Sequence, residues 1–112
     1  MKLIRFNRQN KYGNKGKFYN GRMYDSTFEA NYAETLDWRK KAGEIQEIVP
    51  QFKLELRVDD DHIANYYVDF KVVLSDGTVE FHEVKGFETA EWKIKWRLAQ
   101  SIYGKEKFVL IK

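Results

Sequence analysis

The chain has 112 residues, which is enough for one domain and too few for two. It contains no cysteine, which excludes disulfide bonds, thiolate catalysis and thiolate-bound zinc or iron–sulfur clusters. Hydrophobic residues make up 43% and aromatic residues 16%, which is too rich for a disordered chain. No apolar run approaches the ~20 residues that cross a bilayer, and charge comes too early in residues 1–6 for a secretory signal. The sequence therefore predicts a cytoplasmic protein without a membrane partner.

The formal net charge of +3 hides an uneven distribution. Residues 1–22 form a basic N-terminal arm without any Asp or Glu, whereas residues 23–112 carry more acidic than basic side chains. Aromatic residues lie among the cations of the arm, a composition that suits base stacking and phosphate neutralisation. The arm predicts a nucleic-acid partner, and the alternative is a solvated basic tail that binds nothing. The residues of the arm expected to contact nucleic acid are Lys11, Tyr12, Lys15, Lys17 and Arg22.

The first predicted element is a helix over about residues 26–42. Ser26 and Glu29 have the spacing of a capping box, and Gly43 suits the position after the helix end. Residues 45–49 and 52–56 then have strand patterns, and Pro50 between them either ends a first strand or marks a bulge. Residues 59–61, three consecutive aspartates, predict a polar turn.

The second half of the chain predicts a hairpin, a helix and a buried strand. Residues 64–74 and 78–85 are rich in β-branched and aromatic side chains and flank a loop that ends at Gly77. Thr89 caps a predicted helix that runs to about residue 103, where Gly104 stops it. Residues 108–111 are all apolar, as in a strand covered on both faces. After the arm, residues 23–112 are therefore expected to form a single α/β domain in the order αβββαβ.

Two acidic residues fall inside predicted strands, where burial of a carboxylate is costly unless it binds a cation. Asp69 lies in the strand over residues 64–74, and Glu83 lies in the return strand, two residues before Lys85. A two-residue hairpin loop would place Asp69 opposite Val84, on the wrong face. A three-residue loop with Gly77 in the left-handed region would place Asp69 opposite Glu83. The metal-site hypothesis therefore predicts the three-residue loop or an equivalent bulge.

Paired carboxylates with a nearby lysine suit one kind of chemistry. Two carboxylates facing each other across a strand pair repel unless a cation lies between them, and oxygen ligands favour Mg²⁺ or Mn²⁺. The lysine could steer or polarise an attacking water. The pattern predicts metal-assisted hydrolysis of a phosphodiester.

The element order, with Asp69 followed fourteen residues later by Glu83-Val84-Lys85, resembles the PD-(D/E)xK nuclease superfamily. Several segments also resemble a family of small uncharacterised phage and prophage proteins of that fold. The resemblance covers nearly the whole chain, in order, at residues 11–15, 24–30, 42–45, 67–70 and 83–89. It implies a restriction-endonuclease-like core, with a central mixed sheet flanked by two helices.

The resemblance also implies roles for individual residues. Asp69, Glu83 and the Val84 carbonyl would bind the metal, Lys85 would be the catalytic lysine, and Glu29 would complete the site from the first helix. The proline of the motif name is Val68 here, a departure that many members share. The implied activity is a Mg²⁺- or Mn²⁺-dependent DNA endonuclease, phage-encoded and acting in the bacterial cytoplasm on branched DNA, as Holliday junction resolvases do. Two active sites per junction imply a homodimer.

Other interpretations of these residues stay open. The Glu-x-Lys pattern is common by itself, since Glu91-Trp92-Lys93 repeats it inside a predicted helix. Glu29 could serve only the capping box, and Glu34 would then be the alternative metal ligand on the first helix. Gln51 could approach the site from a strand end. On the second helix, Lys93 and Lys95 could bind phosphates or simply face solvent. The rival functions are a catalytically silent DNA-binding module and a nuclease subunit that requires a phage replication, recombination or packaging protein.

Overall fold

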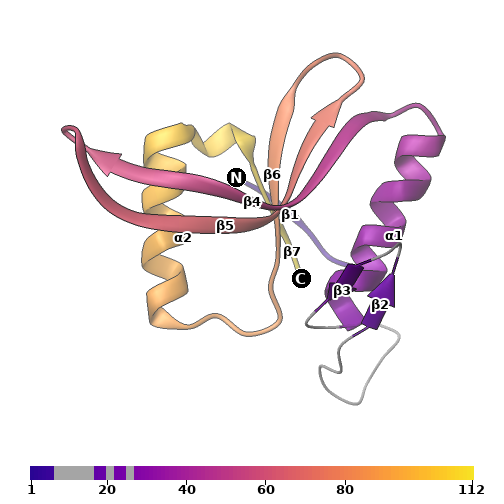
Figure 1. Cartoon of the computed structure of the whole chain (residues 1–112), viewed down its shortest axis with the longest axis horizontal. Coiled ribbons are helices and arrows are strands. Elements are labelled where there is room, and N and C mark those ends of the chain that lie inside the picture. The colour runs from indigo at the N-terminus through magenta and orange to yellow at the C-terminus, as the bar shows by residue number, and fades with distance from the viewer. Residues whose placement is uncertain (7–16, 20–21, 25–26) are drawn as a thin grey trace.

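The structure is a computed structural model that describes residues 1–6, 17–19, 22–24 and 27–112. The predicted order αβββαβ is confirmed, and three short strands precede it. Figure 1 shows the elements, which in chain order are β1 (Lys2–Ile4), β2 (Lys17–Tyr19), β3 (Arg22–Tyr24), α1 (Thr27–Lys41), β4 (Ile45–Val58), β5 (Asp61–Leu74), β6 (Val79–Val84), α2 (Ala90–Tyr103), the short 3₁₀ helix η1 (Lys105–Lys107) and β7 (Phe108–Ile111).

A mixed five-stranded sheet with the strand order β1-β7-β6-β5-β4 forms the centre of the molecule. The strands β4, β5 and β6 pair antiparallel, whereas β6 pairs parallel with β7 and β7 with β1. The helices α1 and α2 lie on opposite sides of this sheet (Figure 1). All four residues of β7 are buried, as the apolar run predicts, because side chains of alternate residues pack toward each helix.

The strand β1 was not predicted, because the arm was interpreted only by its charge. Residues Lys2, Leu3 and Ile4 pair with Val109, Leu110 and Ile111 of β7. Without β1, the buried strand β7 would leave one row of backbone groups unpaired. The start of the basic arm is therefore part of the sheet.

Local sequence signals set the ends of the helices. Beyond α1, Gly43 has φ +86°, and the Glu44 N–H donates to the Arg39 carbonyl, which ends the helix near the predicted residue. At the start of α2, the Thr89 hydroxyl accepts a hydrogen bond from the Trp92 N–H at 3.1 Å. Gly104, at φ +105°, ends α2.

The alternatives at Pro50 and in the hairpin loop are settled by the backbone. A single strand β4 passes through Pro50, and Gln51 directly after it has φ +50°, so the interruption is internal to one strand. In the β5–β6 loop, the Leu74 N–H donates to the Thr78 carbonyl at 2.8 Å, and Gly77 has φ +88°. The loop therefore has three residues, as the metal-site hypothesis requires.

The β4–β5 hairpin packs against α1 on one side of Gln51 and against α2 on the other side. On β5, Phe70 and Val72 belong to the core cluster under α1. Tyr66 and Val68 also have even numbers, but they belong to the core cluster under α2. Even-numbered residues of a flat strand would all face one side. The change of side occurs at Asp69, which lies opposite Gln51 with its positive φ. The hairpin therefore bends at the position of Asp69.

No helix in the described ranges is long and apolar enough to cross a membrane.

Candidate functional site

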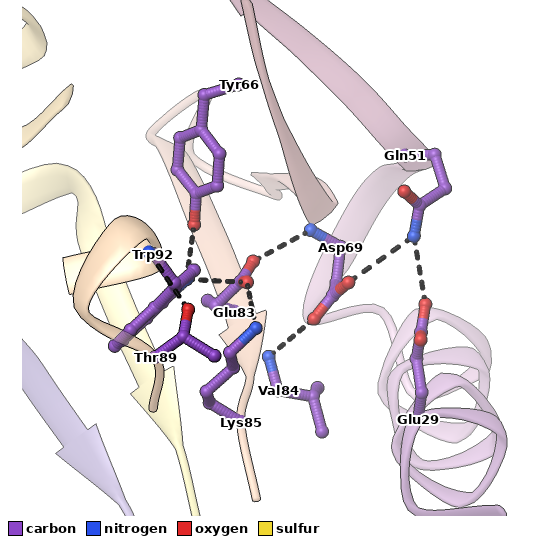
Figure 2. Close-up of polar contacts among 9 residues, drawn as sticks. All are labelled: Glu29, Gln51, Tyr66, Asp69, Glu83, Val84, Lys85, Thr89 and Trp92. Carbon is purple, nitrogen blue, oxygen red and sulfur yellow. Dashed lines mark hydrogen bonds and ion pairs between the residues drawn. The ribbon is translucent and has the colours of Figure 1, made fainter. Parts of the chain in front are cut away.

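Asp69 and Glu83, called the acidic pair below, lie side by side on β5 and β6. The β5–β6 register runs from Val73 opposite Val79 to Phe70 opposite His82, and its continuation by one position brings Asp69 to Glu83. There, the Asp69 N–H donates to Glu83 Oε2 at 3.2 Å, and the Val84 N–H donates to Asp69 Oδ2 at 2.7 Å (Figure 2). The predicted juxtaposition is confirmed.

Glu83 is held in a nearly dry environment, with 4% of its surface exposed. Its Oε1 accepts a hydrogen bond from Trp92 Nε1 at 2.9 Å, and the Tyr66 hydroxyl lies 3.2 Å from the same indole nitrogen. Burial and the nearby Asp69 charge raise the pKa of Glu83 well above its usual range, although Lys85 opposes this shift. Burial and the Glu83 charge likewise raise the pKa of Tyr66, so this hydroxyl stays protonated. An added positive charge beside Glu83 would favour its ionised form.

Lys85 follows Glu83 by two residues and lies on the same face of the chain. Its Nζ is 4.0 Å from Glu83 Oε1 and 5.1 Å from the centre of the Trp92 ring. The Lys85 N–H donates to the Ile111 carbonyl at 2.9 Å, which continues the β6–β7 pairing past the end of β6. The ammonium group is therefore beside the acidic pair and held by two neighbours (Figure 2).

Glu29 reaches the site through Gln51. The side-chain amide of Gln51 donates to Glu29 Oε1 at 3.0 Å and to Asp69 Oδ1 at 3.3 Å, so it lies between the two carboxylates (Figure 2). Among the described residues, no hydrogen bond or ion pair joins Glu34, the alternative on α1, to Asp69, Glu83 or Gln51. Within the described residues, no three His, Asp or Glu side chains form a ready-made metal cluster. The donor set is two adjacent carboxylates, with a third one amide away.

The residues predicted to bind nucleic acid are only partly described. On α2, Lys93 is exposed and Lys95 forms an ion pair with Glu91 at 3.5 Å. Lys17 and Arg22 lie in β2 and β3, but their side chains fall outside the described part. Lys11, Tyr12 and Lys15, together with the Ser26 of the expected capping box, also lie outside the described residues.

Sequence reasoning missed two residues of this site and undervalued a third. The apolar spacing of Trp92 indicated only a core position, and Tyr66 was counted as a strand residue. Both are buried, but each also has a polar group near Glu83. A signal was present, since a buried indole N–H or phenol normally requires a hydrogen-bond partner, and Glu83 was the unpaired acid nearby. Gln51 was considered only as one alternative that could approach the site from a strand end, whereas it bonds both Glu29 and Asp69.

His82 faces away from Glu83, as strand alternation predicts. Its Nδ1 lies 2.7 Å from the Tyr32 hydroxyl of α1, and its Nε2 lies 2.9 Å from Glu80 Oε1. Burial lowers the pKa of His82, although its hydrogen bond to Glu80 opposes this shift. The three residues join α1 to β6 on the side of the sheet opposite the acidic pair.

No curated protein and no solved structure gives a significant match to this chain. A family model described as "Protein of unknown function (DUF1064)" matches residues 9–111. That match includes the acidic pair, Lys85, Glu29 and Gln51 and covers well over half of the chain. The chain belongs to the DUF1064 family.

Proposed function

We propose that this protein is a metal-dependent endodeoxyribonuclease with a restriction-endonuclease-like core. The observation that carries the proposal is the acidic pair, Asp69 and Glu83, with Lys85 Nζ 4.0 Å from Glu83. Two adjacent carboxylates, one of them buried, are unfavourable unless a cation or strong donors compensate them. The mixed sheet with a helix on each side, in the order αβββαβ, supports the same proposal.

The donors of the site suit a hard divalent cation. Asp69, Glu83 and the Val84 carbonyl would hold Mg²⁺ or Mn²⁺, since all three supply oxygen, and Glu29 would approach from α1. A bound metal would polarise the phosphate and lower the pKa of a bound water.

The residues of the chain supply orientation and charge. Lys85 carries a positive charge that can attract a non-bridging phosphate oxygen and orient a water toward the phosphorus. Trp92 and Tyr66 keep Glu83 fixed and exclude bulk water around it, which strengthens its electrostatic interactions. Attack on the phosphorus would leave 5′-phosphate and 3′-hydroxyl ends.

A domain of this size has little surface for reading a base sequence, which favours recognition of DNA shape. We therefore propose branched DNA as the substrate and a homodimer as the acting form, on analogy with junction resolvases. The same analogy proposes a phage-encoded protein that works in the bacterial cytoplasm with recombination, replication or packaging proteins.

The test is cleavage of a labelled four-way junction, with linear duplex and single-stranded DNA beside it, in Mg²⁺, Mn²⁺ or EDTA. We expect cleavage that needs metal and is lost in Asp69→Asn and Lys85→Ala. The matched controls are Asp60→Asn, in the exposed turn of the β4–β5 hairpin, and Lys40→Ala, on the exposed surface of α1; both should cleave normally. Cleavage that survives Asp69→Asn would contradict the proposed site.

One observation favours a second candidate, a DNA-binding domain without catalysis. The acidic pair is already satisfied by donors of the protein, and among the described residues no buried side-chain nitrogen or oxygen lacks a partner. The site could therefore be purely structural. In that case DNA binding would be the same in EDTA and in Mg²⁺, and no substrate would be cut.

A further inference from the structure

A groove runs between the β4–β5–β6 sheet and the C-terminal end of α2. Its volume is about 620 Å³, within the range of ligand-binding sites. Its cations are Lys53, Arg57, Lys71 and Lys107, and we call it the basic groove. Nothing in the proposed catalytic chemistry uses it.

The basic groove continues the face that carries the acidic pair. Phe81 in its wall precedes Glu83 by two residues on β6, so both side chains leave the same side of that strand. Lys71, the partner of Phe81 on β5, follows Asp69 by two residues. The step from the acidic pair to Lys71 is therefore about 7 Å along the strand.

The charge of the groove is strongly one-sided. Among the described residues, Glu55 is the only carboxylate in its lining, and this carboxylate already pairs with Arg57 at 3.0 Å. Within the described part of the chain, no ion pair joins Lys53, Lys71 or Lys107 to an acidic side chain. Three cations remain to attract an anion.

Aromatic packing fixes the shape of the groove. The rings of Phe52 and Phe81 stack with centres 6.1 Å apart, and the edge of Tyr103 meets Phe81 at 6.2 Å. Lys71 Nζ lies 4.8 Å above the Phe52 ring, and the Tyr103 hydroxyl donates to the Glu55 carbonyl at 2.7 Å. These contacts position the Lys71 ammonium before any ligand arrives, which reduces the entropy lost on binding.

We propose that the basic groove binds the phosphate backbone of the DNA strand that leads to the acidic pair. This inference rests on the proposed function for the identity of its ligand. Carboxylates repel a polyanion, so a site that brings DNA to Asp69 and Glu83 needs cations close by. Lys85 supplies one, and the groove supplies more on the same face. Backbone binding of this kind is independent of sequence and falls steeply with salt.

The experiment measures binding of the full-length protein to a labelled four-way junction in EDTA, between about 50 and 200 mM salt. Lys71→Glu should weaken binding at least about fivefold at 0.1 M salt and lower the slope of log K against log salt by about 0.9. Lys40→Glu changes the net charge equally on an exposed face of α1 and should have little effect. Lys71→Gln removes the positive charge without adding a negative one, so it should give an intermediate loss, and it replaces Lys71→Glu as the test if that variant fails to fold.

Three outcomes would overturn the inference. The first is normal binding by Lys71→Glu, and the second is equal weakening by Lys40→Glu, which would indicate only net charge. The third concerns a parallel measurement of binding to polyglutamate. If Lys71→Glu loses binding to polyglutamate but binds DNA normally, the groove is a site for acidic protein and not for DNA. EDTA prevents cleavage, so this result is separate from the nuclease test: loss of binding in Lys71→Glu supports the groove even if no variant cuts DNA.

Discussion

At the scale of single residues, Trp92 has two tasks in addition to its place in the core. Its N–H donates to Glu83, and its ring face lies under the Lys85 ammonium, so one rigid side chain contacts both. Trp92 is itself stacked on Trp96, with ring centres 5.4 Å apart. The orientation of the proposed catalytic groups thus depends on packing within α2.

Trp92→Phe tests this dependence. It keeps an aromatic face for Lys85 but removes the N–H donor from a buried carboxylate, which should lower the free energy of unfolding by about 1–3 kcal/mol. A supporting partner of a metal ligand also affects affinity, so Mn²⁺ binding should weaken roughly 10–100-fold. Urea denaturation and calorimetric titration measure the two effects. Trp96→Phe, on the same face of α2 and with no side-chain hydrogen bond among the described contacts, should preserve Mn²⁺ affinity. Equal loss of affinity in both variants would mean that only helix packing matters.

Gln51 holds Glu29 and Asp69 together through its amide donors. Gln51→Glu replaces these donors with a third negative charge. We expect a loss of about 1–3 kcal/mol of stability in EDTA, because two hydrogen bonds become repulsive contacts. Mg²⁺ should restore part of the loss in this variant and change the wild type less, as thermal unfolding with and without the metal would reveal. A Gln51→Glu protein as stable as the wild type in EDTA would contradict this account of the site.

At the scale of elements, α1 and β6 carry residues of one site but lie in different layers. The Tyr32–His82 hydrogen bond joins these two elements. Tyr32 follows Glu29 by three residues on α1, and His82 directly precedes Glu83 on β6. Both side chains are buried, at 3% and 1% exposure, so water cannot replace either partner. This hydrogen bond therefore helps to fix the distance between α1, which carries Glu29, and the sheet that carries Gln51.

Tyr32→Phe should therefore cost about 1–3 kcal/mol of unfolding free energy, since it leaves His82 Nδ1 without its partner in the core. Tyr103→Phe removes a solvent-exposed hydrogen bond of the same length, 2.7 Å, and should cost about 0.5–1 kcal/mol. Denaturant unfolding of both variants at neutral pH gives the comparison. A smaller loss for Tyr32→Phe than for Tyr103→Phe would rule out a special role for the buried contact.

At the scale of the whole molecule, the N-terminal residues complete the fold rather than trail from it. The strand β1 extends the sheet beyond β7, and Phe6 then packs on α1. Its ring stacks on Phe28 at 5.8 Å and meets the Tyr32 ring edge-on at 5.6 Å. One end of the chain thus ties the sheet to the helix that carries Glu29.

Phe6→Ala should lower stability by about 2 kcal/mol, because a half-buried ring loses both aromatic neighbours. Leu3→Ala is the matched control in the same segment. Leu3 is 44% exposed, so this change should stay within about 0.5 kcal/mol of the wild type. The two midpoints in a urea titration decide the matter, and similar midpoints would place residues 1–6 outside the cooperative unit.

Elements whose boundaries depend on local chemistry were predictable from the amino-acid sequence. Thr89 and Gly104 delimit α2 because their capping preferences act within one turn. Gly77 suits the left-handed position of a three-residue loop, but the two-residue loop stayed open until the backbone showed which one forms. That loop set the register, and the register brought Asp69 to Glu83. The sequence therefore predicted the juxtaposition of the acidic pair only on the condition that the loop has three residues, a condition that the structure meets.

The residues that surround the acidic pair, in contrast, come together only in the folded chain. Trp92 and Gln51 reach it from α2 and from the far strand of the hairpin, at sequence separations that no periodicity reports. Likewise, β1 forms only because β7 offers a free edge more than 100 residues away in the chain. The bend at Gln51, which turns the hairpin from one helix to the other, depends on both helices being in place. These features follow from the packing of distant segments, which local propensities cannot encode.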